Sequence, residues 1–497
     1  MPFSHNRNQY NLQISKKKNF VFYKKINNFK YDPTFEFVNI VENEKFSFLY
    51  ESVEKGKDKG RYTICGYHSI HTILLQNKKL TEKKLNKKKI SIINGNPLER
   101  IDKIIKNSKF KKNKNLPPMV GSFFGFLSYE NIYNIEKISI KRKKNKLKTP
   151  DIILFIPEIL IIHDNLTKSI YILKHHLSNE KNIADYDHIV KDFKKIEANL
   201  KLEVKDVNID LKKKKKIIIR SNVKKSKFIK NIKTSKSYIK NGDIFQVVPS
   251  QRFEIDYKIN TSLLYKTLRV TNPSPFMYYF NLPKFHIVGS SPEILVRIRS
   301  NIITIRPIAG TRPRGKNVRQ DKKHELDLLR DNKEIAEHLM LLDLGRNDVG
   351  KVSKKSTVKV TSKFIIEKYS HVMHIVSNVV GRLKEKISPI KALMAGFPAG
   401  TVSGAPKIRA MQIIDELEEE SRGIYAGGIG YISPDGDMDT CIVLRTGIIT
   451  NEKLYVQAGG GVVYDSNPEM EYRETVNKAK AVLNAASIAI GNSKWFY

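Results

Sequence analysis

The feature that most constrains the fold is the punctuation of residues 227–497, where Gly, Pro and Thr repeatedly interrupt short apolar runs. Runs of strand length and β character occupy residues 244–248, 286–289, 302–305, 427–432, 441–446 and 454–457. Helical periodicity covers residues 332–344, 406–420 and 468–490. Because strands and helices do not alternate regularly, the pattern predicts an α/β fold of the α+β type, with large, mainly antiparallel mixed sheets flanked by helices.

The first 200 residues have a different texture. Strand-like runs lie at residues 46–50, 62–66, 91–93 and 152–162, and a helical segment at 185–202. Residues 201–226 contain a run of five lysines and neither Gly nor Pro, which indicates a connection between two regions. We therefore predict an N-terminal region over residues 1–203, a Lys-rich connection over 204–226 and a larger domain over 227–497.

The chain of 497 residues has a formal net charge of +40, which raises the question of nucleic-acid binding. Three quarters of the excess lies in residues 1–250, largely as lysine runs with few aromatic neighbours, at residues 16–18, 87–89, 141–148 and 212–216. Sequence-reading proteins favour Arg forks and aromatic stacking platforms, so no specific nucleic-acid partner is expected.

Other compositional features place the protein in a compartment. Two cysteines, Cys65 and Cys441, cannot form a disulfide framework or a thiolate zinc site. The apolar run at 152–162 is too short to span a membrane and contains Pro157 and Glu158. With no apolar signal core at the N-terminus, these features predict a cytoplasmic protein without membrane contact.

Glutamates recur in pairs near the starts of two expected helices. Glu334 and Glu337 are three residues apart on one, and Glu471 and Glu474 three apart on the other. Each pair shares a helix face, so two such helices meeting at a cleft could offer several carboxylates to a hard cation. An acidic first turn favoured by the helix dipole explains any single pair equally well.

Glycine-rich turns and two cationic or titrating residues complete the pattern. Residues 310–311, 399–407 and 459–461 form turns whose backbone could approach an anion, although ordinary tight turns are the simpler reading of each. Arg445 and His374 lie in apolar, strand-like runs. A buried strand arginine is costly unless it meets a carboxylate or a phosphate, whereas a single histidine there is more often a core residue.

Six segments occur together in a distinctive order: IKNGDIFQVVPSQR at 239–252, GSSPE at 289–293, RPIAGTRPRG at 306–315, AEHLMLLDLGRND at 336–348, FPAGTVSGAPK at 397–407 and QAGGGVV at 457–463. They resemble the chorismate-utilising enzymes, and among these the large subunits of anthranilate synthases. The resemblance is dense over residues 240–490. In the N-terminal half it is thin and is carried by LYESVEKG at 49–56.

Two positions separate members of that family by chemistry. Aminodeoxychorismate synthases have a nucleophilic lysine where this chain has Ala309, and isochorismate synthases have a water-activating lysine where it has Gln246. The resemblance thus implies a Mg²⁺-dependent lyase that converts chorismate and ammonia to anthranilate and pyruvate, the first step of tryptophan biosynthesis. An aminodeoxychorismate or isochorismate synthase of the same fold is the alternative, as is a basic binding protein that has lost catalysis.

The resemblance also implies roles for particular residues. Glu293 is expected to be the general acid, His374 to act in pyruvate loss and aromatisation, and Thr401 to belong with these catalytic residues. Glu337 and Glu474 are expected to hold Mg²⁺. The chorismate-binding residues are expected to be Gly310, Thr311, Tyr425, Arg445, Gly459, Gly460 and Gly461.

Regulation and partners follow from the same resemblance. Ser52 with Pro275, Phe276 and Met277 matches a tryptophan feedback site, which makes residues 1–203 a regulatory region. Phe276 stands where tyrosine is common in the family. Neither cysteine lies in a nucleophile elbow, so a separate glutamine amidotransferase subunit is expected to supply ammonia, in an assembly of two large and two small subunits.

Overall fold

The computed structural model describes residues 3–53, 60–111, 113–136, 138, 142–178, 180, 185–202, 209–369 and 372–493. Part of the predicted Lys-rich connection, residues 204–208, lies outside them, as does Lys141 of one lysine run. The predicted mixed fold with mainly antiparallel sheets is confirmed, because every pairing between named strands is antiparallel. None of the described helices is long and apolar enough to cross a lipid bilayer.

The strands of the first half pair with those of the second. They are β1 (Phe20–Ile26), β2 (Ser47–Glu51), β3 (Tyr62–Gln76), β4 (Lys79–Lys84), β5 (Lys87–Ile92), β6 (Phe123–Leu127), β7 (Ile152–Asp164), β8 (Ser169–His176), β9 (Arg220–Ser221), β10 (Gln246–Val247), β11 (Ser250–Asp256), β12 (Phe276–Leu282), β13 (Phe285–Ser291), β14 (Ile294–Arg299), β15 (Ile302–Ile305), β16 (Ile308–Pro313), β17 (Lys359–Lys368), β18 (Val372–Arg382), β19 (Gly404–Ala405), β20 (Gly428–Ile432), β21 (Met438–Ile442), β22 (Thr446–Thr450) and β23 (Lys453–Gly459).

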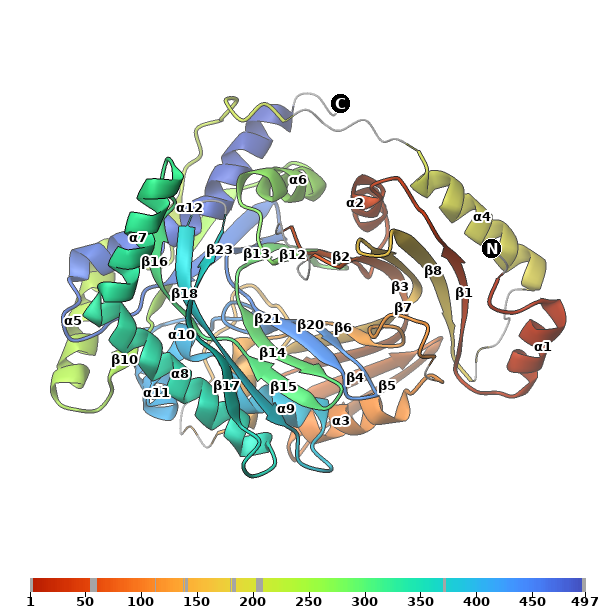
Figure 1. Ribbon diagram of the computed structural model, residues 1–497, viewed down its shortest axis with the longest axis horizontal. Helices are drawn as coiled ribbons and strands as arrows, with labels where there is room; N and C mark the ends of the chain where they lie inside the picture. The colour runs from red at the N-terminus through yellow and green to blue at the C-terminus, as the bar shows by residue number, and fades with distance from the viewer. Residues whose placement is uncertain are drawn as a thin grey trace.

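The helices lie outside these strands (Figure 1). They are α1 (Arg7–Ser15), α2 (Thr34–Asn43), α3 (Pro97–Asn107), α4 (Tyr186–Leu200), α5 (Lys225–Lys240), α6 (Thr261–Thr271), α7 (Val318–Arg330), α8 (Asn332–Val352), α9 (Pro389–Ala395), α10 (Gly400–Ser403), α11 (Lys407–Leu417) and α12 (Pro468–Asn492), with a 3₁₀ helix at Tyr129–Asn134. The ends of α8 and α12 follow their sequences: Asp331 and Asn467 cap the N-termini, and Pro468 begins α12.

Alternation along the strands produces two sheet faces. On β12, Tyr278 and Phe280 point into one core cluster with Phe48 of β2, whereas Met277 and Tyr279 point into another. The first cluster lies on one face of the large sheet, and the second lies on the other face beneath α2, α6 and α12. A third cluster lies on the opposite side, under α3, α8 and α9. Period-two patterning therefore buries both faces of one large sheet of 21 strands, with helices packed outside it.

Among the described residues, two strand pairs join the N-terminal half to the rest. β2 pairs with β12 with Met277 opposite Glu51, and β6 pairs with β20 with Gly430 opposite Gly125. The division at residues 203 and 226 stays a prediction. Its connection runs along the last turns of α12, where the Ser487 hydroxyl donates to the carbonyl of Lys215 at 2.7 Å.

The predicted strand at residues 441–446 is wrong as a single element. β21 ends at Ile442 and β22 begins at Thr446, and Arg445 between them has φ +47°. A run of apolar residues cannot distinguish one buried strand from two strands joined by a buried turn. Arg445 therefore lies in a turn rather than in mid-strand.

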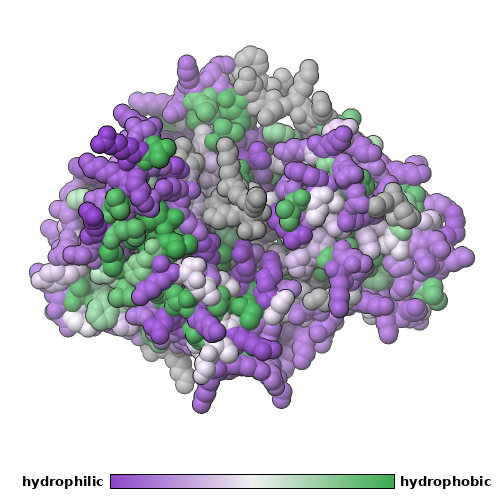
Figure 2. All heavy atoms as spheres, viewed as in Figure 1, coloured by the Kyte–Doolittle hydropathy of each residue, from purple (hydrophilic) through white to green (hydrophobic). Residues whose placement is uncertain are grey.

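The visible surface is uneven in polarity. On the face seen in Figure 1, hydrophilic residues cover most of the right half, and hydrophobic residues gather on the left (Figure 2). Exposed apolar side chains on α7 and α8, the helices on that side, are Val318, Leu326 and Leu339.

Candidate active site

Four glutamates in the first two turns of α8 and α12 approach one another. Glu337 accepts a hydrogen bond from the side-chain amide of Gln246, with Nε2 2.9 Å from its Oε1. Burial, opposed by that bond, raises the pKa of Glu337, and Glu334 and Glu474 raise it further. Burial and Glu474 likewise raise the pKa of Glu471. The predicted meeting of two acidic helix starts is therefore present.

The donor set suits a hard cation. One carboxylate oxygen of Glu471 is buried and makes no hydrogen bond within the described residues. Mutual repulsion among oxygen-only ligands is what a Mg²⁺ ion relieves. No three acidic, His or Cys side chains among the described residues are close enough to enclose a metal by themselves. Mg²⁺ usually keeps several water or substrate ligands, so two carboxylates such as Glu337 and Glu474 fit it.

Glu293 is a buried carboxyl between β13 and β14. The Thr401 hydroxyl, at the start of α10, lies 3.2 Å from each of its carboxyl oxygens. Burial raises the pKa of Glu293 to about 8, although Thr401 and Lys478 oppose the shift. At neutral pH this carboxyl is therefore mostly protonated and can donate a proton.

His374, on β18, uses one of its ring nitrogens in hydrogen bonds. Its Nδ1 lies 2.8 Å from the carbonyl oxygen of Gly310 and 3.1 Å from the hydroxyl of Thr311. A carbonyl only accepts, so Nδ1 carries the hydrogen and Nε2 keeps its lone pair. Burial lowers the pKa of His374. The neutral ring is thus oriented as a base.

Besides its contact with His374, the position of residue 310 requires a glycine. It adopts φ +68°, and a Cβ atom there would lie 3.1 Å from Oε2 of Glu334. Glycine permits both the left-handed backbone and the close approach. Residues 310–311, expected in a turn, instead form a bulge within β16, which places His374 and the acidic start of α8 on neighbouring sides of one site.

Arg445 supplies a cation to the site. Its side chain forms no ion pair within the part of the chain that the structure describes, and its carbonyl accepts from the Ser290 amide at 3.2 Å. Burial lowers its pKa, and its charge lowers that of His374. Arg445 is only partly exposed, and an arginine withdrawn from water without a carboxylate partner is costly unless an anionic ligand pairs with it.

Tyr425 and the glycines at 459–461 form a further wall. A Cβ atom on Gly459 would lie 2.8 Å from the Tyr425 hydroxyl, and one on Gly461 2.8 Å from Nε2 of Gln246. One on Gly460 would lie 3.3 Å from the Glu471 side chain. Burial raises the pKa of Tyr425 to about 12. Side chains at these glycines would displace the polar groups of the site.

Lys478 was not singled out by the sequence analysis. Its Nζ donates to Oε1 of Glu474 at 2.7 Å and to the carbonyl of Gly459 at 3.1 Å. It lies one helical turn beyond Glu474, and that i, i+4 spacing is the signal that could have found it. Lys478 therefore links the carboxylate pair to the glycine wall.

The predicted regulatory residues come together elsewhere. Ser52 directly follows β2, and the amide of Val53 donates to the carbonyl of Ser274 at 3.3 Å. Ser52 lines two neighbouring cavities of about 700 Å³ and 500 Å³, and Pro275 and Phe276 line the second. Met277 differs: its side chain is fully buried in the core and lines neither cavity.

Comparisons with known proteins agree with this geometry. The profile of the chorismate binding enzyme family matches residues 46–484. The chain belongs to this family. The match includes most of the N-terminal half, where the sequence resemblance was thin.

Relatives extend the similarity to nearly full length. Anthranilate synthase component 1 of Cereibacter sphaeroides is 44% identical over 457 residues, which is 91% of each chain. That of Aquifex aeolicus is 43% identical over 460 residues, or 91% of this chain and 92% of the relative. Anthranilate synthase component I of Streptococcus pneumoniae superposes with a TM-score of 0.75 at 37% identity, covering 86% of this chain and 95% of the other.

A more distant member shows the fold alone. The menaquinone-specific isochorismate synthase of Escherichia coli superposes with a TM-score of 0.69 at 16% identity, covering 94% of this chain and 95% of the other.

Proposed function

We propose that the chain is the large subunit of an anthranilate synthase, a lyase that forms anthranilate and pyruvate from chorismate and ammonia. The observation that carries this is similarity at 40–44% identity over about nine-tenths of the chain to proteins of that name. Ala309 and Gln246 support it, because neither position offers the lysine expected of the alternative synthases.

Substrate binding uses Arg445 and the glycines at 459–461. Chorismate is a dianion, and Arg445 can bind one of its carboxylates through two parallel charge-assisted hydrogen bonds. The Tyr425 hydroxyl and the backbone at Gly459, Gly460 and Gly461 close the same side. Gly310 and Thr311 line the ring.

A different titrating group acts in each of the two half-reactions. In the first, ammonia bonds to ring carbon C2 while the C4 hydroxyl leaves as water, taking its proton from the Glu293 carboxyl. In the second, Nε2 of His374 accepts the C2 proton as the C3–O bond breaks. The enolpyruvyl group leaves as the enolate of pyruvate, with the C3–O electron pair on its oxygen, and takes up a proton at its methylene carbon, while the C2–H electron pair completes the aromatic ring.

Mg²⁺, held by Glu337 and Glu474, would supply electrophilic stabilisation of the ring carboxylate. Burial and neighbouring carboxylates raise the pKa of Glu337 and of Glu471, although Lys478 opposes both shifts, and this repulsion supports the assignment.

The test is direct. The protein is incubated with chorismate, Mg²⁺ and ammonium, and anthranilate fluorescence is followed. Accumulation of aminodeoxychorismate or isochorismate would identify one of the alternative synthases, and absence of any product would support a binding protein.

We also propose a glutaminase partner and feedback by tryptophan. The relatives' name, component 1, implies a second component, and the cavities at Ser52 support an amino-acid ligand. Glu51 and Arg269, which form an ion pair at 2.7 Å, line the larger cavity beside Ser52. An assembly of two large and two small subunits remains a prediction.

Replacement of Ser52 by Ala should weaken inhibition by tryptophan about five- to hundredfold, because a hydrogen bond to the ligand's polar end is lost. Turnover without inhibitor should change little. Tryptophan is titrated against the ammonia-dependent reaction of both proteins, with Ser237→Ala on the outer face of α5 as the control. Equal inhibition of wild type and Ser52→Ala would remove Ser52 from the site.

Replacement of His374 by Asn should slow pyruvate loss more than ammonia addition. An aminated but non-aromatic compound should then accumulate, because the base that accepts the C2 proton is missing. Chromatography of quenched reactions measures this compound. If chorismate simply remains unconsumed, His374 acts in the first half-reaction or in positioning.

A further inference from the structure

Arg422 is a fully buried cation outside the proposed substrate contacts. It is 2% exposed and lies in the loop between α11 and β20. Its guanidinium carbon is 4.8 Å from the ring centre of Tyr129 and 5.6 Å from that of Tyr425. The cation therefore lies within cation–π distance of a ring of the N-terminal half and of a ring of the proposed active site.

Hydrogen bonds from Arg422 reach two further segments. Nη1 donates to the carbonyl of Val402 at 2.7 Å, and Nη2 to the carbonyl of Val248 at 2.6 Å. Val402 follows Thr401 in α10, and Val248 lies two residues after Gln246. One guanidinium thus bonds to the backbone next to Thr401, which contacts Glu293, and to the backbone near Gln246, which contacts Glu337.

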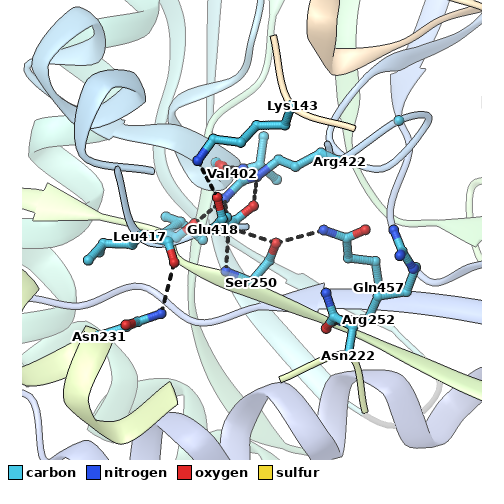
Figure 3. Close-up of polar contacts among 12 residues, drawn as sticks. Lys143, Asn222, Asn231, Ser250, Arg252, Val402, Leu417, Glu418, Arg422 and Gln457 are labelled. Carbon is cyan, nitrogen blue, oxygen red and sulfur yellow. Dashed lines mark hydrogen bonds and ion pairs between the residues drawn. The ribbon is translucent and has the colours of Figure 1, made fainter. Parts of the chain in front are cut away.

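The Glu418 carboxylate fixes the orientation of the guanidinium (Figure 3). Its carboxylate accepts from Arg422 at 2.6 Å and 3.0 Å, and also from the amide and hydroxyl of Ser250 at 2.7 Å and 2.9 Å. Lys143, from the N-terminal half, donates to the carbonyl of Glu418 at 2.6 Å. This network leaves Arg422 little freedom to rotate.

The N-terminal half also holds the backbone beside Arg422. The amide of Tyr129 donates to the carbonyl of Gly423 at 2.9 Å, and the amide of Gly423 donates to the carboxyl of Glu130 at 3.2 Å. Tyr129 and Glu130 thereby fix the backbone at Gly423, two residues before Tyr425.

We propose that Arg422 is a positioning residue that holds Tyr425 and Thr401 in register across the chorismate site. The inference rests on the proposed function of that site. A buried ion pair adds little stability over well-packed apolar residues, so stability alone does not account for this arrangement. Its hydrogen bonds end on backbone groups next to site residues, and only a planar fork reaches both carbonyls and the carboxylate together.

Arg422→Lys keeps the positive charge but loses the planar guanidinium and its several hydrogen-bond donors. We expect kcat/KM for chorismate to fall about ten- to hundredfold, mostly through KM, while the KM for ammonium at saturating chorismate stays unchanged. Arg252→Lys is the matched control, because Arg252 is also buried and paired, with Glu420, but bonds to no wall of the site. A folded Arg422→Lys protein with wild-type constants, or an equal loss in Arg252→Lys, would overturn the proposal.

Tyr129 provides a test that does not alter Arg422. Tyr129→Leu removes the ring over the cation and should lower kcat/KM about three- to tenfold. Tyr129→Phe should match wild type, because the Tyr129 hydroxyl has no hydrogen-bond partner within the described residues. Equal kinetics for the two variants would contradict the proposal even if Arg422→Lys does not fold.

Failure of the proposed function is separable from failure of this inference. If the wild-type protein forms no anthranilate, crystal structures of wild type and Arg422→Lys still compare the positions of the Tyr425 ring and of Thr401. Unchanged positions would overturn the positioning role, and displaced ones would support it whatever the reaction.

Discussion

Replacement of Glu337 or Glu474 by Gln should reduce anthranilate formation about 10³-fold or more, whereas the fold should survive. Loss of one metal ligand removes several kcal/mol of transition-state stabilisation, and each ~1.4 kcal/mol is a factor of ten in rate. Burial and nearby carboxylates already hold the pKa of Glu337 above its usual range. The free energy of unfolding of Glu337→Gln should therefore equal or slightly exceed that of wild type.

The measurements are steady-state rates across a Mg²⁺ titration, Mg²⁺ binding by calorimetry and thermal denaturation. Glu469→Gln is the control on α12, since Glu469 is half exposed and pairs with Lys225 on the surface. Asp343→Asn, whose partner is Arg346, is the control on α8. Near wild-type activity of either active-site variant at limiting Mg²⁺ would exclude that glutamate as a metal ligand.

Local sequence was sufficient for this pair of helices. Glu334 with Glu337 and Glu471 with Glu474 follow capping residues at the expected spacing, so their shared faces could be predicted before the structure. Their convergence could not be derived from spacing, because the two helix starts are more than 130 residues apart in the chain. That step came from the family resemblance.

Other parts depend on tertiary contacts that no local pattern carries. Arg445 was expected within a strand, yet it occupies a left-handed turn where the buried run breaks. No local pattern distinguishes Arg422, because its neighbours Tyr129, Val248 and Val402 are distant in sequence. Met277 was grouped with the regulatory residues, although strand alternation turns it into the core while Phe276 faces the cavity.

Glu293→Gln should lower kcat about 10²- to 10⁴-fold, the usual contribution of a general acid. In the wild-type enzyme, kcat/KM should fall as the pH rises through about 8, because burial raises the pKa of Glu293 to about 8 and the reactive form is protonated. The residual activity of Glu293→Gln should lack this basic limb. A variant that keeps both the rate and the basic limb would exclude Glu293 as the acid.

The substitution Glu293→Gln, which lowers activity, should raise the free energy of unfolding at high pH. The pKa of Glu293 in the folded protein lies above its ordinary value, so the folded state binds this proton more tightly than the unfolded chain. Stability is therefore lost as the pH rises from the ordinary carboxyl range through about 8, and Gln at this position avoids that loss. Glu293→Gln should be more stable than wild type at pH ~9, with a smaller difference at pH ~5.

Asp102 supplies the matched control for this comparison. It lies on α3, and burial raises its pKa to about 6, opposed by a hydrogen bond from Ser388. Asp102→Asn should shift the pH dependence of stability in the same sense while leaving the pH–rate profile unchanged. Thermal denaturation and initial rates across the same buffers thus separate a buried carboxyl that acts on the substrate from one that affects folding alone.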